Sequence, residues 1–96
     1  MNEHLLSTLR KYFAGQPVKR AWLFGSFSRG EARADSDIDI LVNFDDNVSL
    51  FKYAAMTEEL EELLKRAVDL VSESSLFSWV RPSVEHDRIL IYEREA

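Results

Sequence analysis

Hydrophobic residues recur at helical spacing in two stretches of the chain. The first stretch predicts a helix over residues 2–14, which Gly15 and Pro17 bring to an end. The second predicts a helix over residues 50–66, with Ser49 placed to cap its first turn. The apolar stripes of these two helices consist of Leu5, Leu6, Leu9, Tyr12 and Phe13, and of Tyr53, Met56, Leu60, Leu63, Leu64 and Ala67. One face of each helix is therefore expected to pack against a core.

Shorter apolar segments between and after these helices predict strands. Residues 18–24 predict the first strand, and within it residues 21–24 form a nearly continuous apolar run, which is typical of a strand covered on both faces. Residues 37–44 alternate acidic and apolar side chains, residues 67–72 form a short apolar strand, and residues 89–92 a weaker last one. The order of elements predicts an α+β (α/β-like) domain in which helices flank a small mixed β-sheet.

Length and composition indicate one domain over residues 1–96. The chain is 46% hydrophobic and 30% charged, so it is expected to fold. Short helices are also expected over residues 74–80 and 83–88. The chain has no cysteine, no apolar run long enough for a membrane span and no signal-peptide pattern, so a cytoplasmic location and no membrane partner are expected. Its net charge of −5 argues against direct nucleic-acid binding and suits a basic protein partner.

The residues that carry chemistry lie between the first two expected strands. The turn G-S-F-S-R-G spans Gly25–Gly30 and leads into a short expected helix over residues 26–33, whose N-terminal N–H groups can bind phosphate. Asp37 and Asp39 follow, two residues apart on the second strand, so both side chains lie on one face about 6.6 Å apart along it. Two such carboxylates repel each other unless a cation lies between them, and their oxygens suit Mg²⁺.

Three other interpretations of this segment fit it less well. A P-loop requires Lys and Ser or Thr after the second glycine, where this chain has Glu31 and Ala32. A calcium loop that starts at Asp35 requires Gly at the position of Ile40. The third interpretation, a charged strand edge that discourages aggregation, explains the aspartates but leaves the glycine turn before them without a role.

The combination of G-S-x-x-R-G, a short spacer and Ser36-Asp37-Ile38-Asp39 resembles the DNA polymerase β-like nucleotidyltransferases. The short chain resembles their smallest members, the minimal nucleotidyltransferase (MNT) domains, along nearly its whole length. The resemblance implies a fold like the palm of polymerase β. It also implies that Gly25 and Ser26 bind the triphosphate. Gly30 closes the same turn, and Arg29 either helps to bind the phosphates or pairs with an acid of the site.

Asp69 interrupts the apolar strand 67–72 and points to the face opposite Val68 and Leu70. Either it faces water at the strand end or it belongs to the site. The resemblance implies the second, with Asp69 as the third carboxylate beside Asp37 and Asp39. The three would then be catalytic residues and ligands of a two-metal Mg²⁺ site, with ATP as the substrate.

The resemblance also implies a biological role, because stand-alone MNT proteins commonly act as antitoxins of HEPN-domain ribonuclease toxins. The expected reaction transfers AMP from ATP to a tyrosine hydroxyl of the toxin, within a possible hetero-oligomer of the two proteins. Two alternatives stay open: an antitoxin that occludes the toxin without catalysis, and a nucleotidyltransferase for a small molecule or an RNA end. The sequence does not identify the nucleotide, the acceptor or the oligomeric state.

Overall fold

The computed structural model describes residues 3–25, 37–45, 48–73 and 88–94. These residues form two helices and four strands, in the order α1 (Glu3–Ala14), β1 (Val18–Phe24), β2 (Ile38–Phe44), α2 (Leu50–Leu64), β3 (Val68–Ser72) and β4 (Ile89–Glu93). Each strand expected from the sequence is present within one residue of its expected bounds. The expected helices over 26–33 and 74–80, and residues 83–87 of the helix expected over 83–88, lie outside the described residues.

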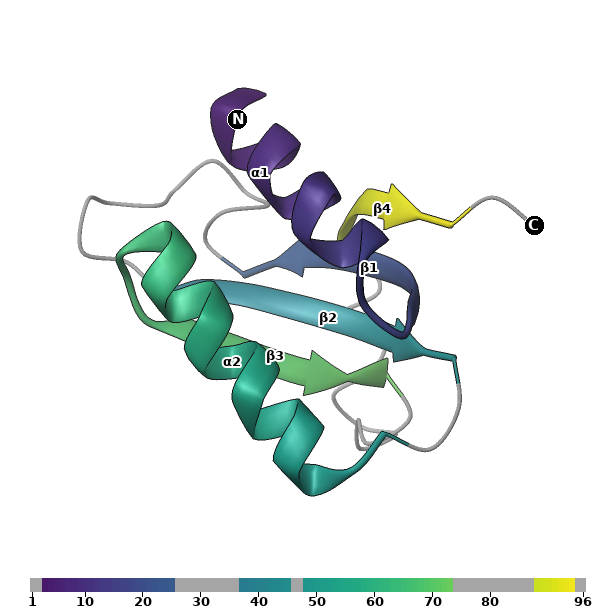
Figure 1. Ribbon diagram of the computed structural model, residues 1–96. Coiled ribbons are helices and arrows are strands. Elements are labelled where there is room, and N and C mark those ends of the chain that lie inside the picture. The colour runs from purple at the N-terminus through teal and green to yellow at the C-terminus, as the bar shows by residue number, and fades with distance from the viewer. Residues whose placement is uncertain (1–2, 26–36, 46–47, 74–87, 95–96) are drawn as a thin grey trace.

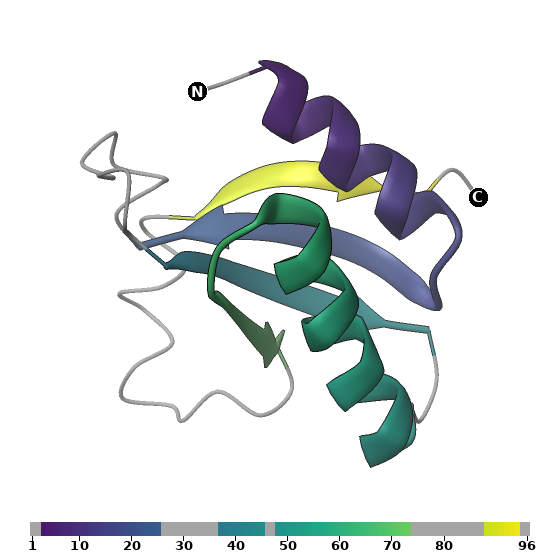
Figure 2. The same cartoon turned by 60° about the vertical axis from the view of Figure 1, so that its left-hand side comes forward.

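The four strands form one mixed sheet in the order β3-β2-β1-β4. β1 pairs antiparallel with β2 and with β4, whereas β2 and β3 run parallel and are joined through α2. Both helices lie on the same face of the sheet, α1 over β1 and β4 and α2 over β3 (Figure 1, Figure 2). The described part of the chain is thus a two-layer α+β domain, as the sequence predicts.

The main core lies between the helices and the sheet. The side chains that face the helices alternate along β2, where Ile38, Ile40 and Val42 are all buried. The helices contribute buried residues from their apolar stripes, and the core includes Leu9, Phe13, Val18, Ala21, Leu23, Met56, Leu60, Val68, Leu70 and Ile91. Because side chains alternate along a strand, Asp39 points to the opposite face, away from the helices.

Helix α2 begins as expected but ends earlier. The Ser49 side chain accepts a hydrogen bond of 3.0 Å from the backbone N–H of Lys52, which caps the helix. The helix stops at Leu64 because Lys65 adopts a left-handed conformation with φ of 58°. The expected continuation to residue 66 is therefore wrong, and the turn carries Ala67 out of the apolar stripe to an exposed position.

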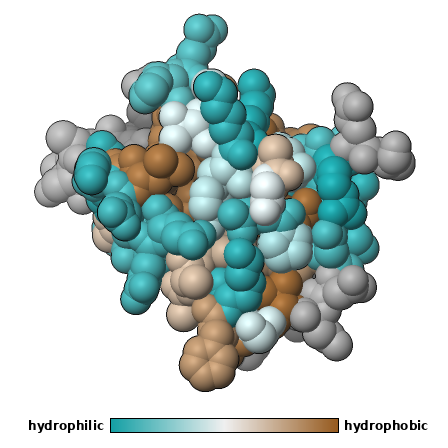
Figure 3. Space-filling model, viewed as in Figure 1, coloured by the Kyte–Doolittle hydropathy of each residue, from teal (hydrophilic) through white to brown (hydrophobic). Residues whose placement is uncertain are grey.

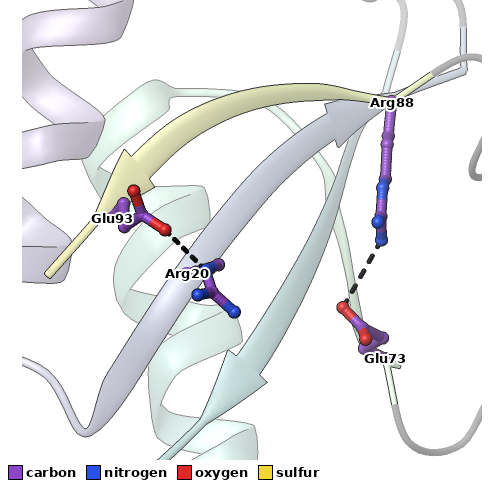
Figure 4. A network of polar contacts seen from close by, with 4 residues as sticks. All are labelled: Arg20, Glu73, Arg88 and Glu93. Carbon is purple, nitrogen blue, oxygen red and sulfur yellow. Dashed lines mark hydrogen bonds and ion pairs between the residues drawn. The ribbon is translucent and has the colours of Figure 1, made fainter.

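Ion pairs link the ends of the strands. Arg20 on β1 pairs with Glu93 on β4 at 2.6 Å, and Arg88 pairs with Glu73 at 3.4 Å, which joins the residue before β4 to the residue after β3 (Figure 4). The first pair is half-exposed, and such pairs contribute about 1 kcal/mol or less to stability. No helix among the described residues is long and apolar enough to cross a membrane.

Candidate active site

Two of the three candidate carboxylates lie side by side on neighbouring strands. Asp39 on β2 and Asp69 on β3 are partners in the parallel register, so their side chains leave the sheet on the same face. That face is the one opposite the helices, because the residues flanking each aspartate, Ile38 and Leu70 among them, are buried in the main core. Asp69 is exposed and Asp39 is half-buried. The chain thus places two carboxylates together without burying either.

Asp37 lies one residue before β2 and is exposed. The sequence predicted Asp37 as the first residue of that strand, so this boundary is wrong by one position. The strand starts at Ile38, whose backbone N–H donates a 3.0 Å hydrogen bond to the carbonyl of Ala67, just before β3. This bond fixes the beginnings of β2 and β3 against each other and so holds Asp37 at the same end of the sheet as Asp39 and Asp69.

The glycine that ends β1 packs against the Asp39 carboxylate. Phe24 is the register partner of Asp39, so Gly25 comes directly beyond it. Gly25 has a φ of 69°, which side chains rarely adopt. A Cβ atom built at Gly25 would overlap Oδ2 of Asp39 and lie 3.2 Å from its Cγ. Both the backbone conformation and the space therefore require glycine here, and the chain that enters the expected phosphate-binding turn passes along the aspartate.

Tyr53 of α2 contacts the strand that carries Asp69. Its hydroxyl donates a hydrogen bond to the carbonyl of Leu70 from the helix face of the sheet. Burial, and in addition the negative charge of Asp69, raises the pKa of the Tyr53 hydroxyl, so it stays a neutral donor. This contact was not predictable from the sequence, because a tyrosine in a helical apolar stripe is typical of an ordinary packing residue.

An apolar layer lies next to the two aspartates on the same face. Trp22 and Leu41 are buried there, with the half-buried Phe24 and Val71 packed against them. The Arg88 guanidinium stacks over the Trp22 ring, 4.4 Å from its centroid. This layer packs β1, β2 and β3 together beside the aspartates, and it explains why residues 21–24 are apolar on both faces.

The donor set suits Mg²⁺, which typically takes one or two carboxylates and completes its shell with water and substrate phosphate. The structure supplies such a pair in Asp39 and Asp69. Within the described ranges, however, no three carboxylate or imidazole side chains are close enough together to hold an ion. Ser26, Arg29 and Gly30 of the predicted phosphate-binding turn lie outside the described residues, so their roles stay predictions.

The sequence of the chain is similar to the sequences of several proteins named as protein adenylyltransferases. It is 45% identical over 74 residues to the protein adenylyltransferase MntA of Thermococcus cleftensis, and the match covers 77% of this chain and 75% of that protein. Several proteins of Methanocaldococcus jannaschii are also similar, the first of them 43% identical over 77 residues.

Solved structures share the fold. A candidate minimal nucleotidyltransferase, 38% identical, has a TM-score of 0.76 and covers 93% of this chain and 95% of that one. A toxin–antitoxin structure with AMP-PNP has a TM-score of 0.82 at 24% identity, covering 94% and 74%. A Shewanella oneidensis complex of a tri-AMPylated HEPN toxin with its MNT antitoxin has a TM-score of 0.67 at 23% identity, covering 96% and 69%. At such low identities the last two show the fold alone.

These likenesses confirm the fold expected from the sequence, a small mixed sheet with helices of the nucleotidyltransferase type. The sequence also matches the polymerase beta nucleotidyltransferase family over residues 7–96, which is nearly its whole length. The expectation that this chain is a nucleotidyltransferase is thereby confirmed. The chain belongs to the polymerase beta nucleotidyltransferase family.

Proposed function

We propose that this protein is a Mg²⁺-dependent protein adenylyltransferase that transfers AMP from ATP to a tyrosine hydroxyl of a HEPN-domain toxin and so neutralises it. The observation that carries the proposal is the placement of Asp39 and Asp69 side by side, with Gly25 packed against Asp39. Such an arrangement suits a cation, because two neighbouring carboxylates repel each other unless a cation lies between them. It also suits a nucleoside triphosphate, because the backbone N–H groups of a glycine turn can bind phosphate.

In this proposal Asp37, Asp39 and Asp69 hold Mg²⁺, which supplies positive charge to the triphosphate when it is bound. Gly25 lets the backbone pass close to the phosphates, and Ser26 donates hydrogen bonds to them. Gly30 closes the same turn. Arg29 adds a positive charge, either near the phosphates or near one of the aspartates. Phosphoryl transfer of this kind depends mainly on position and electrostatics, which these residues provide.

At the α-phosphorus the reaction forms one bond and breaks one, and a proton transfer accompanies this exchange. The tyrosine oxygen of the acceptor attacks the α-phosphorus of ATP, and the bond from that phosphorus to the bridging oxygen of the β-phosphate breaks. Pyrophosphate leaves with the electron pair of that bond. The phenolic proton passes to the carboxylate of Asp69 and then to solvent. Products are the O-adenylyl-tyrosine of the acceptor and pyrophosphate, so no oxidant or reductant is needed. Because the reaction consumes ATP, which the cytoplasm supplies, we place the reaction in the cytoplasm.

The choice of acceptor is supported by the relatives. The Thermococcus cleftensis protein that is 45% identical is named a protein adenylyltransferase, and the Shewanella oneidensis antitoxin of the same fold is found with a tri-AMPylated HEPN toxin. A net charge of −5 suits association with a basic protein rather than with nucleic acid.

Stoichiometry separates catalysis from simple occlusion of the toxin. An adenylyltransferase with Mg²⁺ and ATP is expected to silence many toxin molecules per antitoxin molecule, because the modified toxin stays inactive after release. The measurement is the residual ribonuclease activity of a candidate HEPN partner, sought beside the gene of this chain, at antitoxin-to-toxin ratios from about 1:100 upward. Neutralisation that needs equal amounts and is indifferent to ATP would instead indicate a binder.

A further inference from the structure

The strand that carries Asp69 lies at one side of the sheet. β3 comes first in the order β3-β2-β1-β4, so β2 is the one strand of the described part of the chain that pairs with it. The backbone of an edge strand presents N–H and C=O groups on its outer side, which the sheet itself does not pair. The position of Asp69 therefore depends on what binds the outer side of β3 as well as on the pairing with β2.

The parallel pairing shows which residues of β3 present their peptide groups outward. The Ile38 N–H donates to the Ala67 carbonyl, and the direction of the peptide groups alternates along each strand of a parallel ladder. The N–H and C=O groups of Asp69 therefore point toward β2, whereas those of Val68 and Leu70 point outward. The outward groups thus belong to the two residues that flank Asp69.

Helix α2 supplies a side-chain partner on each side of Asp69. The Glu61 carboxylate accepts a 3.0 Å hydrogen bond from the backbone N–H of Val68. The Tyr53 hydroxyl donates a hydrogen bond to the carbonyl of Leu70. Both side chains can reach the strand because α2 runs along β3 in both ribbon views (Figure 1, Figure 2). The residues before and after Asp69 are therefore both bonded to the same helix.

These two side chains differ from most polar side chains of the helix. Hydrophilic side chains cover much of the helix side of the molecule in Figure 3. Among the glutamates of α2, Glu61 is half-buried, and the exposed ones are Glu58, Glu59 and Glu62. Tyr53 is half-buried too, and its ring packs against Phe44 of β2 with 6.1 Å between the centroids. Tyr53 and Glu61 thus direct their polar atoms to β3.

We propose that Tyr53 and Glu61 are positioning residues that hold Asp69 beside Asp39, so that the two carboxylates can bind one Mg²⁺ ion together. Neither residue touches the cation or the nucleotide, and each acts through the backbone next to Asp69. Hydrogen bonds that orient metal ligands typically contribute roughly 10- to 100-fold to metal affinity, and a bond that acts through the backbone contributes less. The inference rests on the proposed function for the cation, whereas the two hydrogen bonds do not depend on it.

Each substitution in the test removes one hydrogen bond and has a matched control. Tyr53→Phe removes the hydroxyl and keeps the ring contact with Phe44. Its control is Tyr12→Phe, which removes a hydroxyl bond between α1 and α2 from a tyrosine that is also half-buried. Glu61→Leu removes the acceptor of the β3 bond, and its control is Glu62→Leu at the next, exposed position. Glu61→Gln keeps an acceptor oxygen without the charge.

Two measurements separate positioning from general stability. The first is the Mg²⁺ concentration that gives half of the rise in thermal midpoint, with a non-hydrolysable ATP analogue present. The second is the rate of hydrogen exchange at the Asp69 amide, followed by NMR without Mg²⁺. Because an edge strand opens locally before the whole domain unfolds, this rate reports how firmly β3 is held. A bond elsewhere in the domain contributes to the midpoint without contributing to that local opening.

Tyr53→Phe and Glu61→Leu are each expected to raise the half-point Mg²⁺ concentration and the Asp69 exchange rate by about fivefold or more. Tyr12→Phe and Glu62→Leu should leave both quantities within about twofold of the wild type, even where the thermal midpoint falls. Glu61→Gln should lie closer to the wild type than to Glu61→Leu, because it retains the hydrogen bond. In the AMP-transfer assay, Tyr53→Phe should lower kcat at limiting Mg²⁺ and leave the KM for the protein acceptor unchanged.

Half-point Mg²⁺ concentrations that stay at the wild-type value in both Tyr53→Phe and Glu61→Leu would overturn the inference, and so would equal increases in the two controls. A wild type whose midpoint does not respond to Mg²⁺ and that transfers no AMP would contradict the proposed function instead. The exchange rates would then decide the matter of position. Faster exchange at Asp69 in the two variants alone would support the role of the two bonds, and unchanged exchange would overturn it.

Discussion

Gly25 and Asp39 pack so closely that a methyl group at residue 25 would overlap the Asp39 carboxylate. Gly25 directly follows β1 and Asp39 lies on β2, and the two meet because Phe24 and Asp39 are register partners. A single position thus joins the two halves of the motif: the glycine turn that is expected to hold phosphate and the aspartate that is expected to hold the metal.

Gly25→Ala is expected to abolish most nucleotide transfer. The alanine side chain would displace the Asp39 carboxylate, and the φ of 69° adds strain of about 1 kcal/mol to the folded state. The measurement is the initial rate of AMP transfer, with the thermal midpoint recorded for the same sample. We expect a loss in rate of about 100-fold or more and a decrease in the midpoint of a few degrees.

Gly15→Ala is the matched control for that substitution. A Cβ atom at Gly15 would lie 3.8 Å from the Tyr12 carbonyl oxygen, which is an ordinary contact, and Gly15 has no positive φ. Its rate of transfer is expected to equal that of the wild type. If Gly25→Ala transferred AMP as fast as Gly15→Ala, the close approach to Asp39 would have no functional meaning.

Removing the charge of Asp39 or of Asp69 is expected to abolish the stabilisation that Mg²⁺ gives. A ligand that binds only the folded state raises the thermal midpoint, so the wild type should unfold at a higher temperature with Mg²⁺ and a non-hydrolysable ATP analogue. In Asp39→Asn and Asp69→Asn this rise should disappear. Glu58→Gln, at an exposed position of α2, should keep it. A full Mg²⁺-dependent rise in Asp39→Asn would contradict the metal assignment.

Lys65→Gly is expected to stabilise the protein. Lys65 ends α2 with φ of 58° and ψ of 37°, a left-handed conformation that costs a residue with a side chain about 1 kcal/mol and glycine almost nothing. The backbone N–H of Lys65 still donates its 2.9 Å hydrogen bond to Glu61. Urea denaturation should give a free energy of unfolding higher by about 0.5–1 kcal/mol. Lys52→Gly, inside the helix, should lower it.

Tyr12 is expected to make stability fall at alkaline pH. Burial, and then the hydrogen bond and charge of Glu59, raises the pKa of the Tyr12 hydroxyl above its usual value of 10.0. Above pH 10 the unfolded chain loses this proton while the folded chain keeps it, so the free energy of unfolding falls as the pH rises. Below that pH the contribution is fully present. The measurement is the thermal midpoint between pH 8 and pH 11.

Tyr12→Phe is the comparison for that pH profile. Phenylalanine keeps the ring contact with Phe13, 5.5 Å between centroids, but has no proton to lose. Its midpoint should be lower than that of the wild type near neutral pH and should fall less steeply above pH 10. If the midpoints of the two proteins fell equally steeply with pH, the Tyr12–Glu59 hydrogen bond would contribute nothing to the pH dependence of stability.

Much of the fold was predictable from alternation along the chain. Side chains alternate between the two faces of a strand, so the sequence places Asp39 and Asp69 on the face opposite Ile40 and Leu70. The parallel register of β2 and β3 then brings the two aspartates together. The register itself was not predictable, because it depends on α2 returning the chain to the same end of the sheet. Periodicity also could not show that Gly25 would lie against Asp39.

Other features depend on contacts that leave no mark in the sequence. The end of α2 is set by the left-handed Lys65, a residue that otherwise favours helix, and Leu63 is left exposed although it has the spacing of a core residue. The hydrogen bond from Tyr53 to Leu70 joins residues that are 17 positions apart. Each of these depends on how the helices lie on the sheet, which single-residue patterns do not specify.

Transfer of label from α-labelled ATP to a candidate HEPN partner, sought beside the gene of this chain, tests the proposed reaction most directly. With Mg²⁺ present, we expect label on a tyrosine of that protein, release of pyrophosphate in equal amount, and loss of both in the Asp37→Asn, Asp39→Asn double variant. A double variant that transferred label at the wild-type rate, or a wild type that bound the HEPN protein and never labelled it, would contradict the account.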